Sequence, residues 1–271
     1  MEEKKHISKS EQKRRTFMKQ AAGLGVLGVA AAGGIWAAKD FKPKEGRLRP
    51  PGAVPEEQYL SMCIKCGQCL QVCPYDSIKL EDYDGKAGVG TAYIAPLERG
   101  CYLCEAFPCV LACPTGALDH EANVIEKVHM GMAIVVNESA CLALTGQKVT
   151  SEMIGRIYDH TEVITESERK NRKVEIYDND PEKVKLQKEL LQKLSKEEGK
   201  ACEICANLCP FQPDPSQAIG MISKEGGLFP EIREACVGCG ACVELCPTKV
   251  LQILPYASYE DVYGEKGIKN G

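Results

Sequence analysis

Residues 63–74 read CIKCGQCLQVCP, and residues 236–247 read CVGCGACVELCP. Both stretches have the spacing C-x2-C-x2-C-x3-C-P, in which three cysteines share one tight loop and a fourth precedes a proline. Proline has no N–H to donate and fixes its own φ, so it sets the turn that follows the fourth cysteine. We therefore expect the chain to be organised around its cysteines.

All sixteen cysteines of this 271-residue chain can be placed in four such groups. The second group reads CYLCEAFPCVLACP at residues 101–114, with a middle gap longer by two residues. The third reads CEICANLCP at residues 202–210 and lacks its first cysteine. Cys141 is the one cysteine left over, and the acidic and small residues before it resemble those before Cys236. We assign Cys141 as the displaced first member of the third group.

This spacing is that of the thiolates that bind [4Fe–4S] clusters in two-cluster electron carriers. Each motif supplies three ligands to one cluster, and its fourth cysteine binds the neighbouring cluster. The pattern predicts four [4Fe–4S] clusters in close pairs, which suits electron transfer.

The pairing of the motifs is less strongly indicated by the spacing. We expect a nested order, the first motif with the fourth and the second with the third, and sequential pairing stays open. Nested pairing gives four ligand sets: Cys63, Cys66, Cys69 and Cys246; Cys236, Cys239, Cys242 and Cys73; Cys101, Cys104, Cys109 and Cys209; and Cys141, Cys202, Cys205 and Cys113.

Two other roles for the cysteines compete with this one. Zinc sites use C-x2-C pairs, but in two separated halves and not as four closely spaced cysteines. Disulfides suit an exported chain, but back-to-back C-x2-C repeats give poor geometry for unstrained bridges. No catalytic residue is predicted, because the four histidines are scattered and no nucleophile–base pair stands out. Tyr75 and Tyr102 are expected to shield clusters by packing.

The N-terminal residues have the pattern of an export signal. Arg14-Arg15, followed by Phe17, Met18 and Lys19, matches the twin-arginine export signal, and an apolar stretch rich in glycine and alanine follows at residues 21–38. We expect residues 1–39 to be this signal or an uncleaved membrane anchor, and residues 40–58, with four prolines, to be a linker. The predicted location is the periplasm, at the inner membrane.

The charge is unevenly distributed along the chain. Residues 1–50 carry twelve lysines and arginines against five acidic residues, so the rest of the chain has a net charge of −11. An acidic body argues against binding to nucleic acid. It is suited either to a soluble surface or to docking of a basic redox partner.

The predicted fold is α+β, with tandem two-cluster units, small sheets and short helices within residues 59–271. Each helix is expected to follow the third cysteine of a motif, and Met132–Val136 is a predicted strand. Residues 148–200 contain no cysteine and many charges, and we interpret them as an insertion. A helix is predicted there from the N-cap Asp180 to about Glu198, either packed on its own domain or used as a docking arm.

The chain resembles the NapG/MauM family of ferredoxin-type subunits of periplasmic quinol dehydrogenases. The resemblance rests on Arg14-Arg15 with Phe17, on Arg49–Ala53, and on the cysteine segments at 63–67, 101–118, 141–142 and 202–210. It implies bacterial-ferredoxin-like units and electron transfer from a membrane-embedded NapH-type quinol dehydrogenase to a periplasmic cytochrome or molybdenum reductase, such as nitrate reductase. The insertion at 148–200 departs from the family pattern.

Two other functions remain open from the sequence. One is an electron-transfer subunit bound directly to another molybdopterin oxidoreductase or a hydrogenase. The other is a structural metal-binding protein with no redox role.

Overall fold

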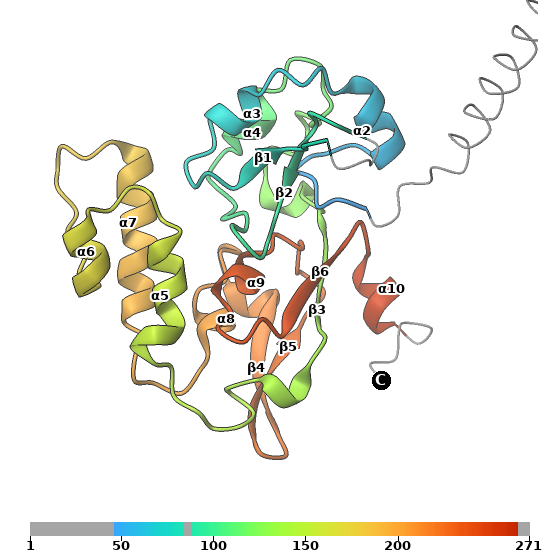
Figure 1. Ribbon diagram of the computed structural model, residues 1–271. Helices are drawn as coiled ribbons and strands as arrows, with labels where there is room; N and C mark the ends of the chain where they lie inside the picture. Colours follow the sequence, from blue (N-terminus) through green and yellow to red (C-terminus); the bar gives the residue numbers. More distant parts are fainter. Residues whose placement is uncertain (1–45, 84–87, 265–271) are drawn as a thin grey trace, which may run out of the picture. The chain divides into compact units, whose positions relative to one another are not determined.

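The computed structural model describes residues 46–83 and 88–264 (Figure 1). The predicted signal and anchor at 1–39 and the first part of the predicted linker lie outside these residues. The strands are β1 Ile78–Leu80, β2 Ala92–Ile94, β3 Gly131–Val135, β4 Ile219–Lys224, β5 Gly227–Ile232 and β6 Leu251–Pro255. The helices are α2 Glu56–Met62, α3 Gln68–Gln71, α4 Pro108–Leu111, α5 Ser151–Asp159, α6 Glu166–Asn171, α7 Glu182–Ser195, α8 Ile204–Asn207, α9 Ala241–Leu245 and α10 Tyr259–Tyr263. Short 3-10 helices span Ile125–Lys127, Glu138–Ala140 and Pro215–Gln217.

The strands form small antiparallel sheets of two strands each, β1 with β2, β3 with β6, and β4 with β5. In the second sheet Gly131 is opposite Pro255 and Val135 is opposite Leu251, so this sheet joins distant parts of the chain. The predicted α+β class is confirmed, and the predicted strand at 132–136 is β3. A two-stranded sheet is marginal by itself, so packing around the cysteines must supply much of the stability.

The four cysteine motifs fold in similar ways. The third cysteine of each motif lies inside a short helix: Cys69 in α3, Cys109 in α4, Cys205 in α8 and Cys242 in α9. The helices are short, as expected, but each begins one residue before the third cysteine and does not follow it. The match at α8 also places Cys202 and Cys205 as second and third members of their motif, which leaves the first position for Cys141.

Left-handed backbone recurs at equivalent positions of the motifs. Lys65, Leu103 and Gly238, which each precede the second cysteine of a motif, have φ values of 61°, 48° and 70°. Three residues after the fourth cysteine, Asp76 and Lys249 have φ values of 56° and 54°. Non-glycine residues adopt this conformation rarely, so its repetition shows that the loops of the motifs share one backbone conformation.

The cysteines are part of the apolar core. Cys73, Cys101, Cys109 and Cys239 are buried within one core cluster together with Tyr59, Val110 and Leu118. Cys141 and Cys246 belong to a second cluster, which packs around β3, β6 and β5. In each of the two clusters, cysteine-bearing loops therefore pack together with residues of the small sheets.

The insertion at 148–200 is helical, as predicted. Its ends lie side by side, because the Val149 N–H donates to the Lys200 carbonyl over 2.9 Å and the Gly199 N–H returns to the Val149 carbonyl over 2.8 Å. Thr150 caps α5, and Thr165 starts α6 with a capping box. The insertion therefore leaves the cysteine-bearing body and returns to it at one point.

The predicted helix at 180–198 is α7, which ends earlier, at Ser195. Asp180 does not cap it. Its carboxylate instead accepts from the Tyr177 N–H and from Lys188, each over 3.1 Å. Leu190, Leu191 and Leu194 of the predicted apolar stripe are buried, whereas Val184 and Leu186 are only half-buried.

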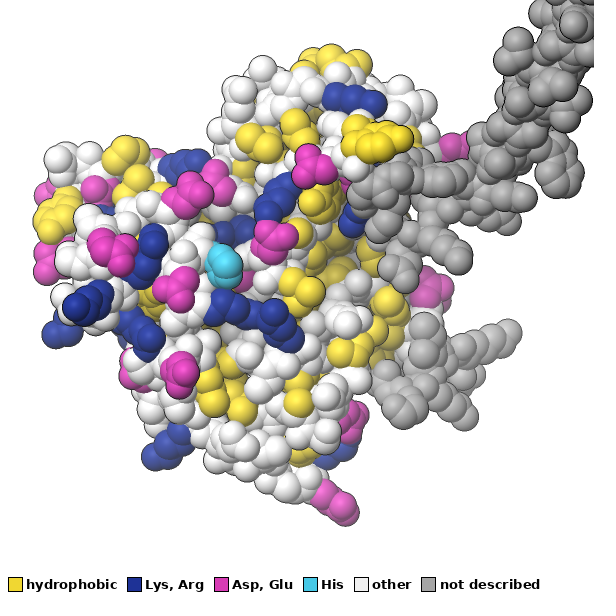
Figure 2. Space-filling model, in the orientation of Figure 1, with side chains coloured by type: hydrophobic (Ala, Val, Ile, Leu, Met, Phe, Trp, Pro, Cys, Tyr) yellow, Lys and Arg dark blue, Asp and Glu magenta, His cyan; other side chains and the backbone are white. Residues whose placement is uncertain are grey.

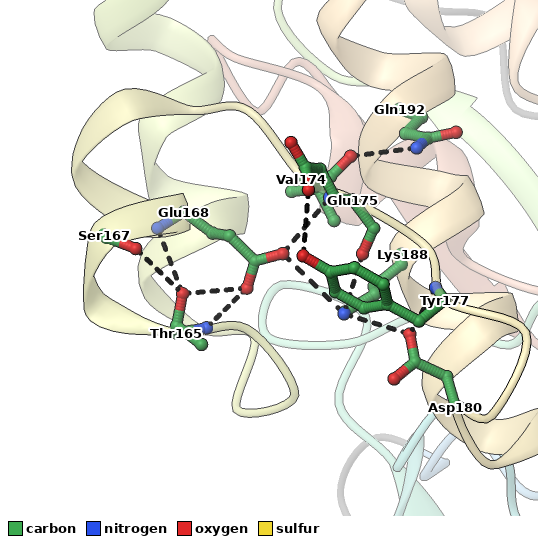
Figure 3. A network of polar contacts seen from close by, with 9 residues as sticks. All are labelled: Thr165, Ser167, Glu168, Val174, Glu175, Tyr177, Asp180, Lys188 and Gln192. Atoms are coloured by element: carbon green, nitrogen blue, oxygen red, sulfur yellow. Dashed lines mark hydrogen bonds and ion pairs between the residues drawn. The ribbon is translucent and has the colours of Figure 1, made fainter.

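The buried Lys188 of α7 bonds the segment between α6 and α7 to this helix (Figure 3). Lys188 is 5% exposed. Its ammonium donates to the Glu175 carbonyl over 2.8 Å and lies 3.7 Å from the Glu168 carboxylate. Figure 2 shows lysine or arginine and carboxylate side chains intermixed over the helices of the insertion. Such a surface is typical of a solvated helical layer.

The predicted linker at 40–58 differs from the structure in its described part. Leu48 and Arg49 are buried, and α2 already begins at Glu56. The guanidinium of Arg49 bonds both carboxylate oxygens of Glu56, at 2.8 and 2.5 Å. It also bonds the Thr91 hydroxyl at 3.0 Å and the Ala92 carbonyl at 2.9 Å. This segment is therefore fastened to β2 and is no free spacer.

None of the helices in 46–83 and 88–264 has the length and apolar character that a membrane crossing requires.

Arg49→Met should lower the free energy of unfolding by about 2–3 kcal/mol, because Thr91 loses its guanidinium donor and Glu56 keeps only the Tyr256 hydroxyl as a donor. Arg49→Lys should recover only part of this, since one ammonium cannot reproduce the planar fork. The matched control is Lys79→Met, which breaks the exposed pair with Glu98 and should cost about 0–1 kcal/mol. Anaerobic urea titrations followed by circular dichroism measure all three. Equal midpoints for Arg49→Met and Lys79→Met would contradict the anchoring role.

Candidate iron–sulfur centres

All sixteen cysteines lie in the described residues, and all are free thiols. They gather in four groups of four. We name them group A (Cys63, Cys66, Cys69, Cys113), group B (Cys73, Cys101, Cys104, Cys109), group C (Cys141, Cys202, Cys205, Cys246) and group D (Cys209, Cys236, Cys239, Cys242). The members of groups A, B and D each line one common cavity. In group C, the thiol of Cys205 is close enough to those of Cys202, Cys246 and Cys141 for each to raise its pKa.

The structure corrects the nested pairing. Cys246 does not join Cys63, Cys66 and Cys69, since their fourth partner is Cys113. Cys73 joins the second motif and not the fourth. Likewise, Cys209 joins the fourth motif, and Cys246 joins Cys141, Cys202 and Cys205. Sequential pairing, first motif with second and third with fourth, is what the chain adopts.

The physical reason for sequential pairing is the packing of the short helices. Helix α3 of the first motif packs against α4 of the second, and α8 of the third packs against α9 of the fourth. The fourth cysteine of each motif comes within two residues of the end of its helix, so each pair of helices exchanges fourth cysteines. The rule that a motif gives three thiols to one site and one to its neighbour therefore holds.

Cys141 reaches group C because the insertion closes on itself. The 3-10 helix Glu138–Ala140 ends at Cys141, whose N–H donates to the Glu138 carbonyl over 3.0 Å. Lys148 and Ala201 form a β-bridge at the base of the insertion. This bridge brings the chain after Cys141 back to the residue before Cys202, so sixty intervening residues do not separate the two thiols.

Burial raises the pKa values of most of these thiols. Burial, together with the nearby thiols of Cys63 and Cys113, raises the pKa of Cys69 to about 11. Burial and the thiol of Cys73 raise the pKa values of Cys104 and Cys109 to about 12. Four thiolates that face one cavity would repel one another strongly. A cationic centre between them removes this penalty, as an iron–sulfide core does.

The donor set fits [4Fe–4S] clusters better than single metal ions. Among the described cysteines, histidines and carboxylates, no three are close enough together to hold one metal ion. A tetrahedral zinc site would need such convergence, since each Zn–S bond is about 2.3 Å. In a [4Fe–4S] cluster each thiolate binds a different iron, so the four sulfurs surround the centre from farther apart.

Backbone N–H groups point at the fourth cysteine of a motif. The Ser77 N–H lies 3.3 Å from the Cys73 sulfur, and the Leu118 N–H lies 3.4 Å from the Cys113 sulfur. Burial tends to raise the pKa of Cys113, but the bonds from Leu118 and Thr115 outweigh it and the pKa is lowered. Hydrogen bonds of this kind stabilise thiolates and set the reduction potentials of clusters.

Tyrosines line two of the groups. The rings of Tyr75 and Tyr102 lie 4.6 Å apart. Tyr102 lines the cavity of group B. Burial raises the pKa of Tyr75 to about 12, with further contributions from Cys104, Glu189, Cys101 and Cys73, so this ring also lies beside group B. Tyr59 lies near Cys63 and Cys69 of group A and was not predicted. The place of Tyr59 in α2, just before the first motif, was the available signal. His120 is exposed, and its ring lies 2.8 Å from the Cys113 carbonyl.

Groups B and D meet across the two halves of the structure. The Cys101 N–H donates to the Cys239 carbonyl over 2.9 Å, and Cys101 forms a parallel β-bridge with Gly240. A Cβ on Gly100 would lie 2.5 Å from the Ala241 nitrogen, so only glycine permits this approach. In group A, Cys66 is exposed, and the nearby Ile64 is 62% exposed.

Comparison with known proteins gives the same division. Two family models, each described as a 4Fe-4S dicluster domain, match residues 62–117 and 200–251. The first match contains the first and second motifs, and the second contains Cys202 onward, in agreement with sequential pairing. Two dicluster domains and sixteen cysteines correspond to four [4Fe–4S] clusters.

Several curated proteins resemble the chain over much of its length. The methylamine utilization ferredoxin-type protein MauM of Paracoccus denitrificans is 30% identical over 242 residues, which cover 86% of this chain and 82% of that protein. The ferredoxin-type protein NapG of Escherichia coli is 38% identical over 143 residues, 51% of this chain and 61% of that protein. NapG of Haemophilus influenzae is 26% identical over 89% of this chain and 71% of its own length. No solved structure matches significantly. The chain belongs to the NapG/MauM family of ferredoxin-type proteins.

Proposed function

We propose that groups A to D bind four [4Fe–4S] clusters and that the protein uses them to carry electrons in the periplasm. The observation that carries the proposal is the gathering of sixteen thiols into four groups of four, arranged in two pairs with exchanged fourth cysteines. Each cluster, when bound, takes up and releases one electron.

The side chains around each group hold the cluster, and those around group B also keep water away. The cysteines supply the ligands, and the N–H groups of Ser77 and Leu118 offset thiolate charge on Cys73 and Cys113. Tyr75 and Tyr102 cover group B with their rings. Burial of this kind favours fast electron transfer, because little solvent must reorganise when the charge changes. No side chain is assigned a catalytic role.

The proposed donor is a membrane-embedded quinol dehydrogenase of the NapH type, and the proposed acceptor is a periplasmic cytochrome or molybdenum reductase such as nitrate reductase. Arg14-Arg15 with Phe17 supports export by the twin-arginine route after the clusters are assembled. The name of the Paracoccus relative refers to methylamine utilization, so a respiratory partner of that system is the second candidate. Purification of the tagged protein from detergent-solubilised membranes tests this. Recovery of a quinol-oxidising membrane protein supports the proposal, and recovery of a hydrogenase or a molybdopterin enzyme alone contradicts it.

Group A is the proposed point of exchange with a partner. Cys66 is exposed there, and the neighbouring Ile64 presents an apolar side chain to solvent. Electron exchange between proteins requires a centre close to the surface, and group A meets this requirement.

Anaerobically purified protein should be brown and contain about four irons and four acid-labile sulfides per cysteine group. Dithionite should bleach its visible absorbance. Metal and sulfide analysis, with absorbance spectra before and after reduction, measures this. A colourless protein that contains zinc but no sulfide would contradict the redox function.

Cys66→Ser and Cys113→Ser should affect the same cluster, because both thiols belong to group A. Each variant should lose or convert one cluster, about a quarter of the iron at most, and should weaken the neighbouring cluster of group B. Cys246→Ser is the matched control, since nested pairing would place it with Cys66. Electron paramagnetic resonance during redox titration identifies the missing signal. The same missing signal in Cys66→Ser and Cys246→Ser would contradict sequential pairing.

Cys141→Ser should affect the same signal as Cys246→Ser, because Cys141 is assigned to group C despite its distance in sequence. The helical content of the variant should be unchanged, since Cys141 lies outside the insertion helices. Circular dichroism and the resonance spectra check both points. Full iron content with all signals intact in Cys141→Ser would show that group C has another fourth ligand.

A further inference from the structure

The contact between groups B and D is held by one buried carboxylate. Glu244 lies in α9, between Cys242 of group D and Cys246 of group C, and is 2% exposed. Its oxygens accept from the Gly100 N–H over 2.7 Å and from the Tyr102 hydroxyl over 2.9 Å. The Arg99 guanidinium donates to it over 3.1 Å.

The three donors to Glu244 surround a single cluster ligand. Arg99, Gly100 and Tyr102 flank Cys101 of group B on both sides. Cys101 itself bonds the Cys239 carbonyl, which lies just before α9, the helix of Glu244. A side chain of the second dicluster unit thus bonds the loop of the first unit at the point where Cys101 of group B approaches group D.

The insertion contacts Arg99, which pairs with the Glu244 carboxylate, and also contacts the backbone of α9. Arg99 also donates to the Thr161 hydroxyl over 3.3 Å, and Thr161 is anchored to the end of α5 through the Ile157 carbonyl. Arg156 of α5 donates to the Glu244 carbonyl and, over 3.2 Å, to the Cys246 carbonyl. Helix α5 therefore locks both the loop at 99–102 and the helix that carries Glu244.

The contacts also define the order of the groups. Groups A and B exchange fourth cysteines, and so do groups C and D. Within residues 46–83 and 88–264, the only backbone contact between cysteines of the two dicluster units joins groups B and D. After burial, the thiol of Cys239 contributes most to the raised pKa of Cys101, ahead of Cys109 of its own group. The groups therefore lie in the order A, B, D, C.

We propose that Glu244 is a positioning residue that holds group B against group D, so that the two dicluster units conduct as one row. This rests on the proposed function, since it requires clusters in both groups. In each transfer one electron leaves one group as one electron arrives at the next, with no bond made or broken. Without Glu244 the two units would still hold their clusters, but electrons would pass less readily between groups B and D.

The test compares Glu244→Ala with Glu244→Gln in the full-length, iron-loaded protein. Alanine removes all three contacts of the carboxylate. Glutamine keeps an oxygen that accepts from Gly100 and Tyr102. Glu105→Ala is the matched control, because Glu105 is an exposed glutamate inside the second motif. Iron content, the resonance spectrum of the fully reduced protein, and hydrogen exchange of the peptide covering residues 99–103 are measured for each variant.

Glu244→Ala should keep its iron but lose the spectral broadening that comes from coupling between the two units. Its peptide at 99–103 should exchange faster, because the Gly100 and Cys101 amides lose protection. Glu244→Gln and Glu105→Ala should match the parent protein in both readouts. Unchanged coupling and exchange in an iron-loaded Glu244→Ala would overturn the inference while leaving the proposed function intact, whereas a parent protein without iron and sulfide would overturn the function itself.

Tyr102→Phe keeps the test decisive if Glu244→Ala does not fold. It removes one of the three donors and almost no volume. Faster exchange at 99–103 with full iron content supports the positioning role, and parent-like exchange contradicts it.

Discussion

The exchange of fourth cysteines between neighbouring motifs is the constraint on which the structure depends. Each motif completes its neighbour, so neither half of a pair can form a four-thiol site alone. The packing of α3 on α4 and of α8 on α9 decides which motifs are partners. The small sheets, the left-handed turns and the cysteines in the core all follow from placing these helices around shared centres. The chain is a ferredoxin-type iron–sulfur electron carrier because this arrangement repeats twice.

Much of this could be predicted from the cysteine spacing. The three-plus-one division of each motif, the α+β class and the position of β3 came from local sequence. The pairing could not, because every motif ends in the same Cys-Pro and nothing local distinguishes Cys113 from Cys246 as a partner for Cys66. Glu244 was missed, although it is the one ionisable residue at its position in the four cysteine runs, where the others have Gln71, Leu111 and Asn207. Asp180 was assigned as a cap, but the buried Lys188 competes for its carboxylate.

The insertion acquires a physical role from its contacts. Its ends close at Val149 and Lys200, which lets Cys141 act beside Cys202. Arg156 of its first helix and Thr161, just after that helix, then support the junction between the two dicluster units. A segment that carries no cysteine thus contributes to the geometry of groups B, C and D. The described part of the segment at 40–58, which was expected to be a linker, similarly fastens the first unit through Arg49.

The identity of the thiol that completes group A tests the account most directly. Crystals of the iron-loaded protein, with anomalous diffraction recorded at the iron edge, would show which sulfur binds each iron. We expect the cluster held by Cys63, Cys66 and Cys69 to be bound by Cys113. Density that joins this cluster to Cys246 would contradict it.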